Sequence, residues 1–433
     1  MVTRRQFLAS LTVPLTLGQT PRGRGTDQAP TGVAVPRTPV GYPALSNIDP
    51  AEVGRQLRRQ FSPLRNHFIF EYYPWYGTNP WRHWEGSGRN PPYDISVTSI
   101  PELGPYDSGN ARVIEQHARW IAESGAGAIN VSWWGRGEYE DRLVPLLMDV
   151  MRDHGLKVTF HLEPYNDSRA DSYASDIQYL ITEYGDKRHW DCQLLLSNAD
   201  GQEGPVFRSF ATLVPQFGTD CHGVTTPIGL WRPDASWRQQ TDRVRDTFRR
   251  HFESVWLVSD SPAPDRVLTA GFDGGAPYGA FTSDNWPQLA RGFSGRNLML
   301  SPSIHTGFDA VVERNVPAGS CYRPPTFQPP ATIDWNSAAD RERAAQLALW
   351  QIEASMRTSL DVQTNPTLRS ASPGLFIAYI STFNEWHEGT SFEPMKDRAA
   401  LLQQELPFGY HNPEHGRYRL DYLKGRLGRI LRG

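Results

Sequence analysis

The sequence has few cysteines, no marked excess of either charge and no long apolar run, and each shortage excludes a class of protein. Its three cysteines, Cys192, Cys221 and Cys321, cannot form a fully paired framework, and their spacing matches no metal site. We expect either no disulfide or one between Cys192 and Cys221. A formal charge of −3 over 433 residues favours neither nucleic acid nor a membrane surface as a partner. No run approaches the ~20 apolar residues of a spanning helix, so we expect no stable membrane span.

The N-terminus carries an export pattern. Arg4 and Arg5 precede Phe7 and a short apolar stretch that ends at Leu17, which is typical of a twin-arginine signal. We therefore expect export to the periplasm or the medium, with the twin-arginine export machinery as a partner. The signal and the start of a linker occupy residues 1–30, and a disordered linker occupies residues 31–50. One folded domain, which we expect to be monomeric, occupies residues 51–433.

Apolar runs alternate with amphipathic stretches through this domain. Uninterrupted apolar runs are typical of strands buried on both faces, as in a parallel sheet. Eight are present, at residues 68–73, 128–134, 157–164, 192–197, 254–259, 270–278, 297–305 and 375–382. We predict an α/β fold, a single (β/α)8 TIM-type barrel with long βα loops that form the cleft. A doubly wound sheet is the alternative, but no glycine-rich phosphate loop follows the first strand.

Polar and aromatic residues gather where these runs end. The last run leads into Asn384-Glu385-Trp386-His387-Glu388, which places two carboxylates, an amide, an imidazole and an indole within five residues. Active sites of barrels lie at the carboxyl ends of the strands, so we expect this cluster to carry chemistry. Two close carboxylates are the basic equipment of a glycosidase, in which one holds a proton and the other accepts one. The alternative is structural, with either glutamate capping a helix and Trp386 packing.

Six motifs occur in order along the chain. They are residues 72–77 with His83-Trp84, 101–108, 131–134, 156–165, 271–274 and 381–390. In these motifs the chain resembles glycoside hydrolase family 99, the endo-α-1,2-mannosidases and endo-α-1,2-mannanases. The resemblance implies a catalytic domain that cleaves internal α-mannosidic bonds, α-1,2-linked by analogy with the family, in α-mannan or mannose-rich oligosaccharides. The resemblance also implies that the reaction retains configuration and uses no metal or cofactor.

The resemblance also implies roles for the two glutamates. Glu385 would deprotonate the 2-hydroxyl of the sugar, which attacks C1 to give a 1,2-anhydro sugar, while Glu388 would protonate the leaving oxygen. The motifs also carry the expected substrate-binding residues. These are Tyr73, Trp75, Tyr76, His83, Trp84, Trp133, Trp134, His161, Glu163, Tyr165, Asp273, Tyr278, Asn384, Trp386 and His387. Trp134 is similar to the mannan-cleaving bacterial members, in contrast to a tyrosine in animal members, and this favours mannose in the neighbouring subsite.

The chain departs from the family pattern over residues 194–220 and after residues 271–274, where only Tyr278 offers the expected phenol. These departures leave two alternatives open. One is a retaining glycosidase of another barrel family with a different α-glycan substrate, although the Asn-Glu pair of such enzymes ends strand four and here ends strand eight. The other is a non-catalytic carbohydrate-binding protein on the same scaffold.

Overall fold

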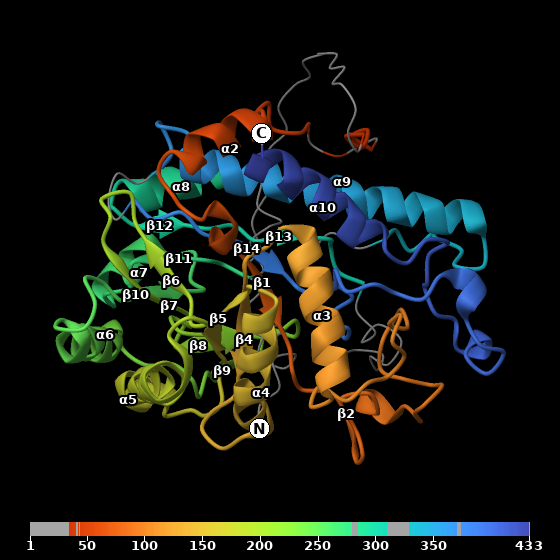
Figure 1. The fold of residues 1–433 in the computed structure, drawn as a ribbon, viewed down its shortest axis with the longest axis horizontal. Helices are drawn as coiled ribbons and strands as arrows, with labels where there is room; N and C mark the ends of the chain where they lie inside the picture. The colour runs from red at the N-terminus through yellow and green to blue at the C-terminus, as the bar shows by residue number, and fades with distance from the viewer. Residues whose placement is uncertain are drawn as a thin grey trace.

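The centre of the protein is a curled parallel sheet of nine strands. The computed structural model describes residues 34–39, 42, 44–278, 285–309, 329–369 and 374–432. The strands follow the order β12-β11-β10-β7-β5-β4-β1-β14-β13, and every neighbouring pair is parallel (Figure 1). Their bounds are β1 Phe68–Tyr72, β4 Ala128–Trp133, β5 Lys157–Leu162, β7 Glu203–Ser209, β10 Trp256–Ser259, β11 Gly274–Gly275, β12 Met299–Leu300, β13 Ile304–His305 and β14 Ala378–Ser381. The predicted α/β fold is confirmed.

Helices connect these strands and cover the sheet. They are α2 Pro50–Arg58, α3 Ala111–Ser124, α4 Tyr139–Asp153, α5 Arg169–Ile181, α6 Asp234–Phe248, α7 Pro264–Thr269, α8 Trp286–Ser294, α9 Ala338–Thr364 and α10 Tyr418–Arg432. In Figure 1, α2, α9 and α10 cross one side of the molecule, and α3 and α4 stand in front of the strands. The C-terminal helix α10 buries Leu420, Leu423, Leu427 and Ile430 against this layer. None of the described helices is long and apolar enough to cross a membrane.

The two ends of the strand order lie close in the chain. β12 and β13 are separated only by residues 301–303, and no ladder joins them among the described strands. The sheet is therefore a curled half-barrel by its hydrogen bonds. The run predicted at residues 297–305 is divided into these two short strands, and the run at residues 270–278 is reduced to the two glycines of β11.

The fourth predicted strand joins the parallel sheet only through one parallel bridge, between Gln193 and Val158 of β5. Within residues 192–197 the structure has β6, Leu195–Ser197, which pairs antiparallel with β7 and lies off the main path. β7 takes the place between β5 and β10 instead. Its sequence is not a continuous apolar run, because it carries Pro205 and Arg208. Arg208 is nevertheless fully buried, since it forms an ion pair with the Glu71 carboxylate inside the sheet.

The cysteine prediction is also wrong. Cys192 is free and buried, with Sγ 3.3 Å from the Met148 carbonyl oxygen, and burial raises the pKa of its thiol to about 12. It therefore cannot bridge to Cys221. Cys221 is itself disulfide-bonded, which overturns the expectation of no disulfide. The export signal predicted over residues 1–30 lies outside the described residues.

His67 gives the fold a predictable sensitivity to acid. Its buried ring donates from Nδ1 to the Phe376 carbonyl oxygen at 2.7 Å, and burial lowers the pKa of His67 from 6.5 to about 4. As pH falls between these values the unfolded chain binds a proton that the folded chain does not. The stability contributed by neutral His67 is therefore complete above pH 6.5 and is lost as pH falls to about 4, by about 3 kcal/mol.

The variant His67→Asn keeps a donor near Nδ1 and cannot titrate. We expect its free energy of unfolding in urea to depend less on pH between 6.5 and about 4 than that of the wild type. Equal slopes for the two proteins across this window would contradict the assignment.

Candidate active site

The side chain of Asn384 ties the end of β14 to the end of β1. Its Oδ1 accepts from the Tyr73 backbone N–H at 2.7 Å, and its Nδ2 donates to the Tyr73 carbonyl oxygen at 3.0 Å. The next turn is fixed by Thr382, whose Oγ1 accepts from the Glu385 N–H at 2.9 Å. Asn384 is fully buried, so these bonds join two chain segments and bring the last motif beside the first.

A buried network around Glu393 holds Trp386. One oxygen, Oε2, accepts from Trp386 Nε1 at 2.9 Å and from the Tyr106 hydroxyl at 2.7 Å. The other, Oε1, lies 3.2 Å from His117 Nε2. Burial, with the nearby Glu393 charge, raises the pKa of Tyr106 well above its usual value, so Tyr106 donates as a neutral phenol. Glu393 carries no motif signal of its own, and the sequence prediction missed it.

Glu385 is paired with His387. Its Oε1 accepts from the His387 backbone N–H at 3.0 Å and lies 3.3 Å from His387 Nδ1. His387 Nε2 lies 2.8 Å from the His83 carbonyl oxygen, which can only accept, so Nε2 carries a hydrogen. His387 Nδ1 therefore faces the carboxylate of Glu385 with its other side held by the His83 carbonyl oxygen. The imidazole is therefore coupled to the charge of Glu385.

Glu388 has a different partner. The Tyr278 hydroxyl donates to Glu388 Oε2 at 2.6 Å, and the Glu388 carbonyl oxygen accepts from the Asp309 N–H at 2.9 Å. Both glutamates are almost completely buried, with 2% exposure for Glu385 and 6% for Glu388. Tyr278, the residue that offered the expected phenol after residues 271–274, is thus hydrogen-bonded to the second carboxylate.

A third carboxylate, Glu163, lies at the end of β5. Ser132 Oγ donates to Glu163 Oε1 at 2.9 Å, and Trp134 Nε1 donates to Ser132 Oγ at 3.1 Å. His161 Nδ1 lies between two carboxylates, 4.0 Å from Glu163 Oε1 and 3.3 Å from Glu71 Oε1. Each of these side chains except the half-buried Trp134 is buried.

Below Glu163, the buried pair of Glu71 and Arg208 fills the inside of the sheet. Glu71 Oε2 accepts from Ser381 Oγ at 2.7 Å, and Arg208 donates to the Ala276 carbonyl oxygen at 2.6 Å. The pair therefore links β1, β7 and β14 with the chain after β11. Neither Glu71 nor Arg208 was among the predicted site residues. The available signal was a glutamate within the apolar run of β1.

Aromatic rings connect the two sides of this cluster. Trp75 stacks on His83 with centroids 4.5 Å apart and lies 6.3 Å from Trp134 and 6.1 Å from His387. On the other side, Phe210 lies between His161 and Tyr278, with centroid distances of 6.0 and 5.8 Å. The contacts run from Glu385 through Trp75 and Trp134 to Glu163, and back through Phe210 and Tyr278 to Glu388. Residues from six strand ends thus form one connected group.

Two predicted residues of the first motifs support this group from behind. Tyr76 stacks on Trp84 with centroids 4.2 Å apart and on His387 at 5.7 Å. The Tyr76 hydroxyl donates to the Asn384 carbonyl oxygen at 3.2 Å, and Trp84 Nε1 donates to the Tyr106 carbonyl oxygen at 2.7 Å. Both rings are fully buried, so their contacts are with the loop that follows β14 and with its neighbours.

Two of the predicted substrate-binding residues lie elsewhere, and a third points its polar atom away. Trp133 faces the helices, where its Nε1 donates to Asp141 on α4 at 2.7 Å. Asp273 lies before β11, at the opposite end from the site, and its buried carboxylate accepts from Arg245 and from the Leu257 N–H. The polar atoms of Trp133 and Asp273 are thus bonded to other parts of the fold. The Tyr165 hydroxyl donates to Asp176 on α5 at 2.5 Å.

Comparison with known proteins shows which family the chain resembles. Residues 63–191 match the model of glycosyl hydrolase family 99. The glycoprotein endo-α-1,2-mannosidases of Xenopus laevis and Mus musculus are each 27% identical to the chain. These alignments cover 82% and 84% of the chain and 75% of each relative. The chain is thus similar to glycoside hydrolase family 99.

The fold is similar to that of a solved family 99 structure. The solved structure of the family 99 endo-α-mannosidase from Bacteroides thetaiotaomicron matches with a TM-score of 0.56 at 22% identity, over 84% of the chain and 97% of that structure. The protein is therefore a glycoside hydrolase. Within the described ranges no group of three His, Cys, Asp or Glu side chains could hold a metal ion.

Removing the Tyr278 hydroxyl should impair hydrolysis without unfolding the protein. In Tyr278→Phe the Glu388 carboxyl loses its donor, and a hydrogen bond to a charged group contributes about 1.5–3 kcal/mol. We expect kcat to fall by about 10- to 150-fold. Tyr422→Phe is the matched control, because it removes a buried tyrosine bond of 2.9 Å to Glu353, between α10 and α9. Similar kcat values for the two variants would contradict a role for Tyr278.

Proposed function

We propose that the protein is an endo-acting retaining hydrolase of α-mannosidic bonds, α-1,2-linked, in α-mannan or mannose-rich oligosaccharides. Its relatives are named endo-α-1,2-mannosidases, and their similarity extends over most of the chain. The observation that carries the proposal is the pair of buried carboxylates three positions apart in separate surroundings. Glu385 is bonded to His387, and Glu388 is bonded to Tyr278.

In the first step Glu385 acts as the base. It takes the proton of the sugar 2-hydroxyl, whose oxygen forms a bond to C1 while the bond from C1 to the glycosidic oxygen breaks. Glu388 gives its proton to that leaving oxygen. The sugar that remains bound to the enzyme is then a 1,2-anhydro sugar. Each proton transfer by a positioned group is typically worth ~10²–10⁴-fold in rate.

In the second step the roles are exchanged. Glu388 takes a proton from water, the water oxygen bonds to C1, and the bond from C1 to the 2-oxygen breaks as Glu385 returns its proton. Two inversions at C1 give overall retention. The coupling of His387 to Glu385 supports this scheme, since the imidazole stabilises the charge that Glu385 must carry before it acts as a base.

Around these carboxylates we assign Trp75, His83 and Trp134 to contacts with the sugar rings and Glu163 to a sugar hydroxyl. Trp134 is half-buried and borders Glu163 through Ser132, which suits an aromatic face beside a polar anchor. We also propose that the curled sheet closes as a (β/α)8 barrel. The support is that residues 301–303 connect β12 directly to β13, so the chain itself spans the two ends of the ladder.

Substitution of either glutamate tests the function directly. Glu385→Gln and Glu388→Gln should each lower turnover of α-mannan and of an aryl α-1,2-mannobioside by ~10²–10⁴-fold, with the melting temperature unchanged. Glu342→Gln, on the exposed face of α9, is the control. Product sizing distinguishes cleavage of internal bonds from release of terminal sugars.

Three outcomes would contradict the proposal in different ways. If either variant kept more than about a tenth of wild-type turnover, the wrong pair would have been assigned. A covalent glycosyl-enzyme trapped on any carboxylate would favour a retaining glycosidase with an enzyme nucleophile. Binding of mannan by the wild type without cleavage from mild acid to neutral pH would identify a carbohydrate-binding protein.

We further propose that the twin-arginine machinery exports the protein, on the evidence of Arg4 and Arg5 before an apolar stretch. The double substitution Arg4→Lys and Arg5→Lys should keep the charge but remove the recognised pair, so the protein should stay in the cytoplasm. Fractionation of cells that express wild type and variant measures this. Equal export of both proteins would contradict the assignment.

A further inference from the structure

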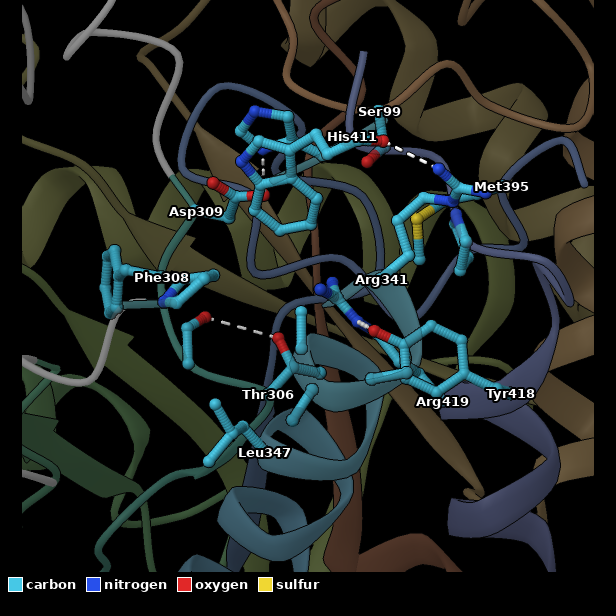
Figure 2. A pocket seen from close by; sticks show the side chains of 17 residues that line it. Ser99, Thr306, Phe308, Asp309, Arg341, Leu347, Met395, His411, Tyr418 and Arg419 are labelled. Carbon is cyan, nitrogen blue, oxygen red and sulfur yellow. Dashed lines mark hydrogen bonds and ion pairs between the residues drawn. The ribbon is translucent and has the colours of Figure 1, made fainter. Parts of the chain in front are cut away.

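A second cluster lies directly behind the loop that carries Glu388. Figure 2 shows Asp309, which follows β13, facing His411, with Arg341 and Arg419 nearby. We propose that His411, acting through Asp309, is a positioning residue that holds Glu388 in place for proton transfer. This inference rests on the proposed role of Glu388 as the acid.

The backbone of Asp309 is locked to the catalytic loop. Its N–H donates to the Glu388 carbonyl oxygen at 2.9 Å. Gly389 has φ +66°, and a Cβ added there would lie 2.2 Å from the Asp309 carbonyl oxygen, so the two backbones run in direct contact. From α10, Arg419 donates to the carbonyl oxygens of Gly389 and Ser391 at 2.9 Å each. A shift of Asp309 must therefore move Glu388.

His411 fixes the side chain of Asp309. The Asp309 Oδ2 lies 2.7 Å from His411 Nδ1, and a carboxylate only accepts, so Nδ1 is the donor. Both side chains are only 15% exposed, which weakens solvent screening of the pair. Thr98 completes the link, because its carbonyl oxygen accepts from the His411 N–H and its hydroxyl donates to the Asp309 carbonyl oxygen, each at 2.7 Å.

The His411 ring is itself held from the other face. It stacks on Trp335 with centroids 3.7 Å apart and planes inclined by 9°. Trp335 is fixed in turn by Arg341, which donates to its carbonyl oxygen at 2.7 Å. A cavity of about 30 Å³ adjoins Asp309 and His411, which is room for about one water. Without His411, the Asp309 carboxylate has space to turn away, and the restraint on Glu388 is lost.

The leaving group of the substrate supplies the test. If Glu388 is displaced, cleavage slows when the leaving oxygen needs a proton. The displacement matters less when the leaving group is a nitrophenol, because it can depart as its anion. We therefore expect His411→Leu to lower kcat by about tenfold or more on a mannose-rich oligosaccharide and by less than about threefold on a nitrophenyl α-1,2-mannobioside, with KM little changed. His411→Asn keeps an N–H donor near Nδ1 and should restore most of the loss.

His415→Leu is the matched control, since His415 also pairs with an aspartate, Asp421 at 3.2 Å, but is 62% exposed and does not contact the Glu388 loop. Hydrogen–deuterium exchange of the peptides that contain Asp309 and Gly389 gives a readout without turnover. We expect faster exchange in His411→Leu and wild-type exchange in His415→Leu and His411→Asn.

The outcomes separate the two proposals. Equal losses on both substrates, or unchanged exchange at Asp309 and Gly389 in His411→Leu, would overturn the role of His411. Absence of cleavage by the wild type on every α-mannoside would refute the proposed function. In that event the exchange experiment still decides whether His411 holds the Glu388 loop.

Discussion

The amide of Asn384 makes the contact on which the site depends. By bonding both backbone groups of Tyr73, it sets the end of β14 against the end of β1. The residues after Asn384 carry the two glutamates, and those after Tyr73 carry the aromatic rings that face them. If this tie were absent, Trp75 and His387 would not be held within ring-contact distance. An amide suits the position because it offers one donor and one acceptor to a single peptide unit.

A second constraint is that nearly all the charge at this end of the sheet is buried. Glu71, Glu163, Glu385, Glu388 and Glu393 are each at most 6% exposed. Burial of an unpaired charge is costly, and removal of one partner of a buried ion pair typically destabilises a protein by about 3–5 kcal/mol. The hydroxyls, indoles, imidazoles and Arg208 around these carboxylates are therefore as necessary to the fold as to the chemistry. This explains why so many aromatic residues with polar atoms gather here.

The parts that sequence could predict are those that follow a local pattern. The apolar runs of β1, β4 and β5 gave their positions to within two residues. β7 escaped detection because its charge, Arg208, is compensated by Glu71, which is distant in the sequence. Trp133 was assigned to the site together with Trp134, although neighbours on a strand point to opposite faces. That rule predicts that one of the two indoles faces the helices.

The residues that no local pattern reveals are those that act on the loop from other segments, such as Glu393 through Tyr106, and Asp309 with His411. They also show how two carboxylates three residues apart can lie in different surroundings. Glu385 is bonded to its own neighbour His387, whereas Glu388 is held by Tyr278 from the β11 side and by Asp309 from the β13 side. Because these partners differ, each carboxylate lies in independent surroundings. Acid–base chemistry by a pair of glutamates requires this independence.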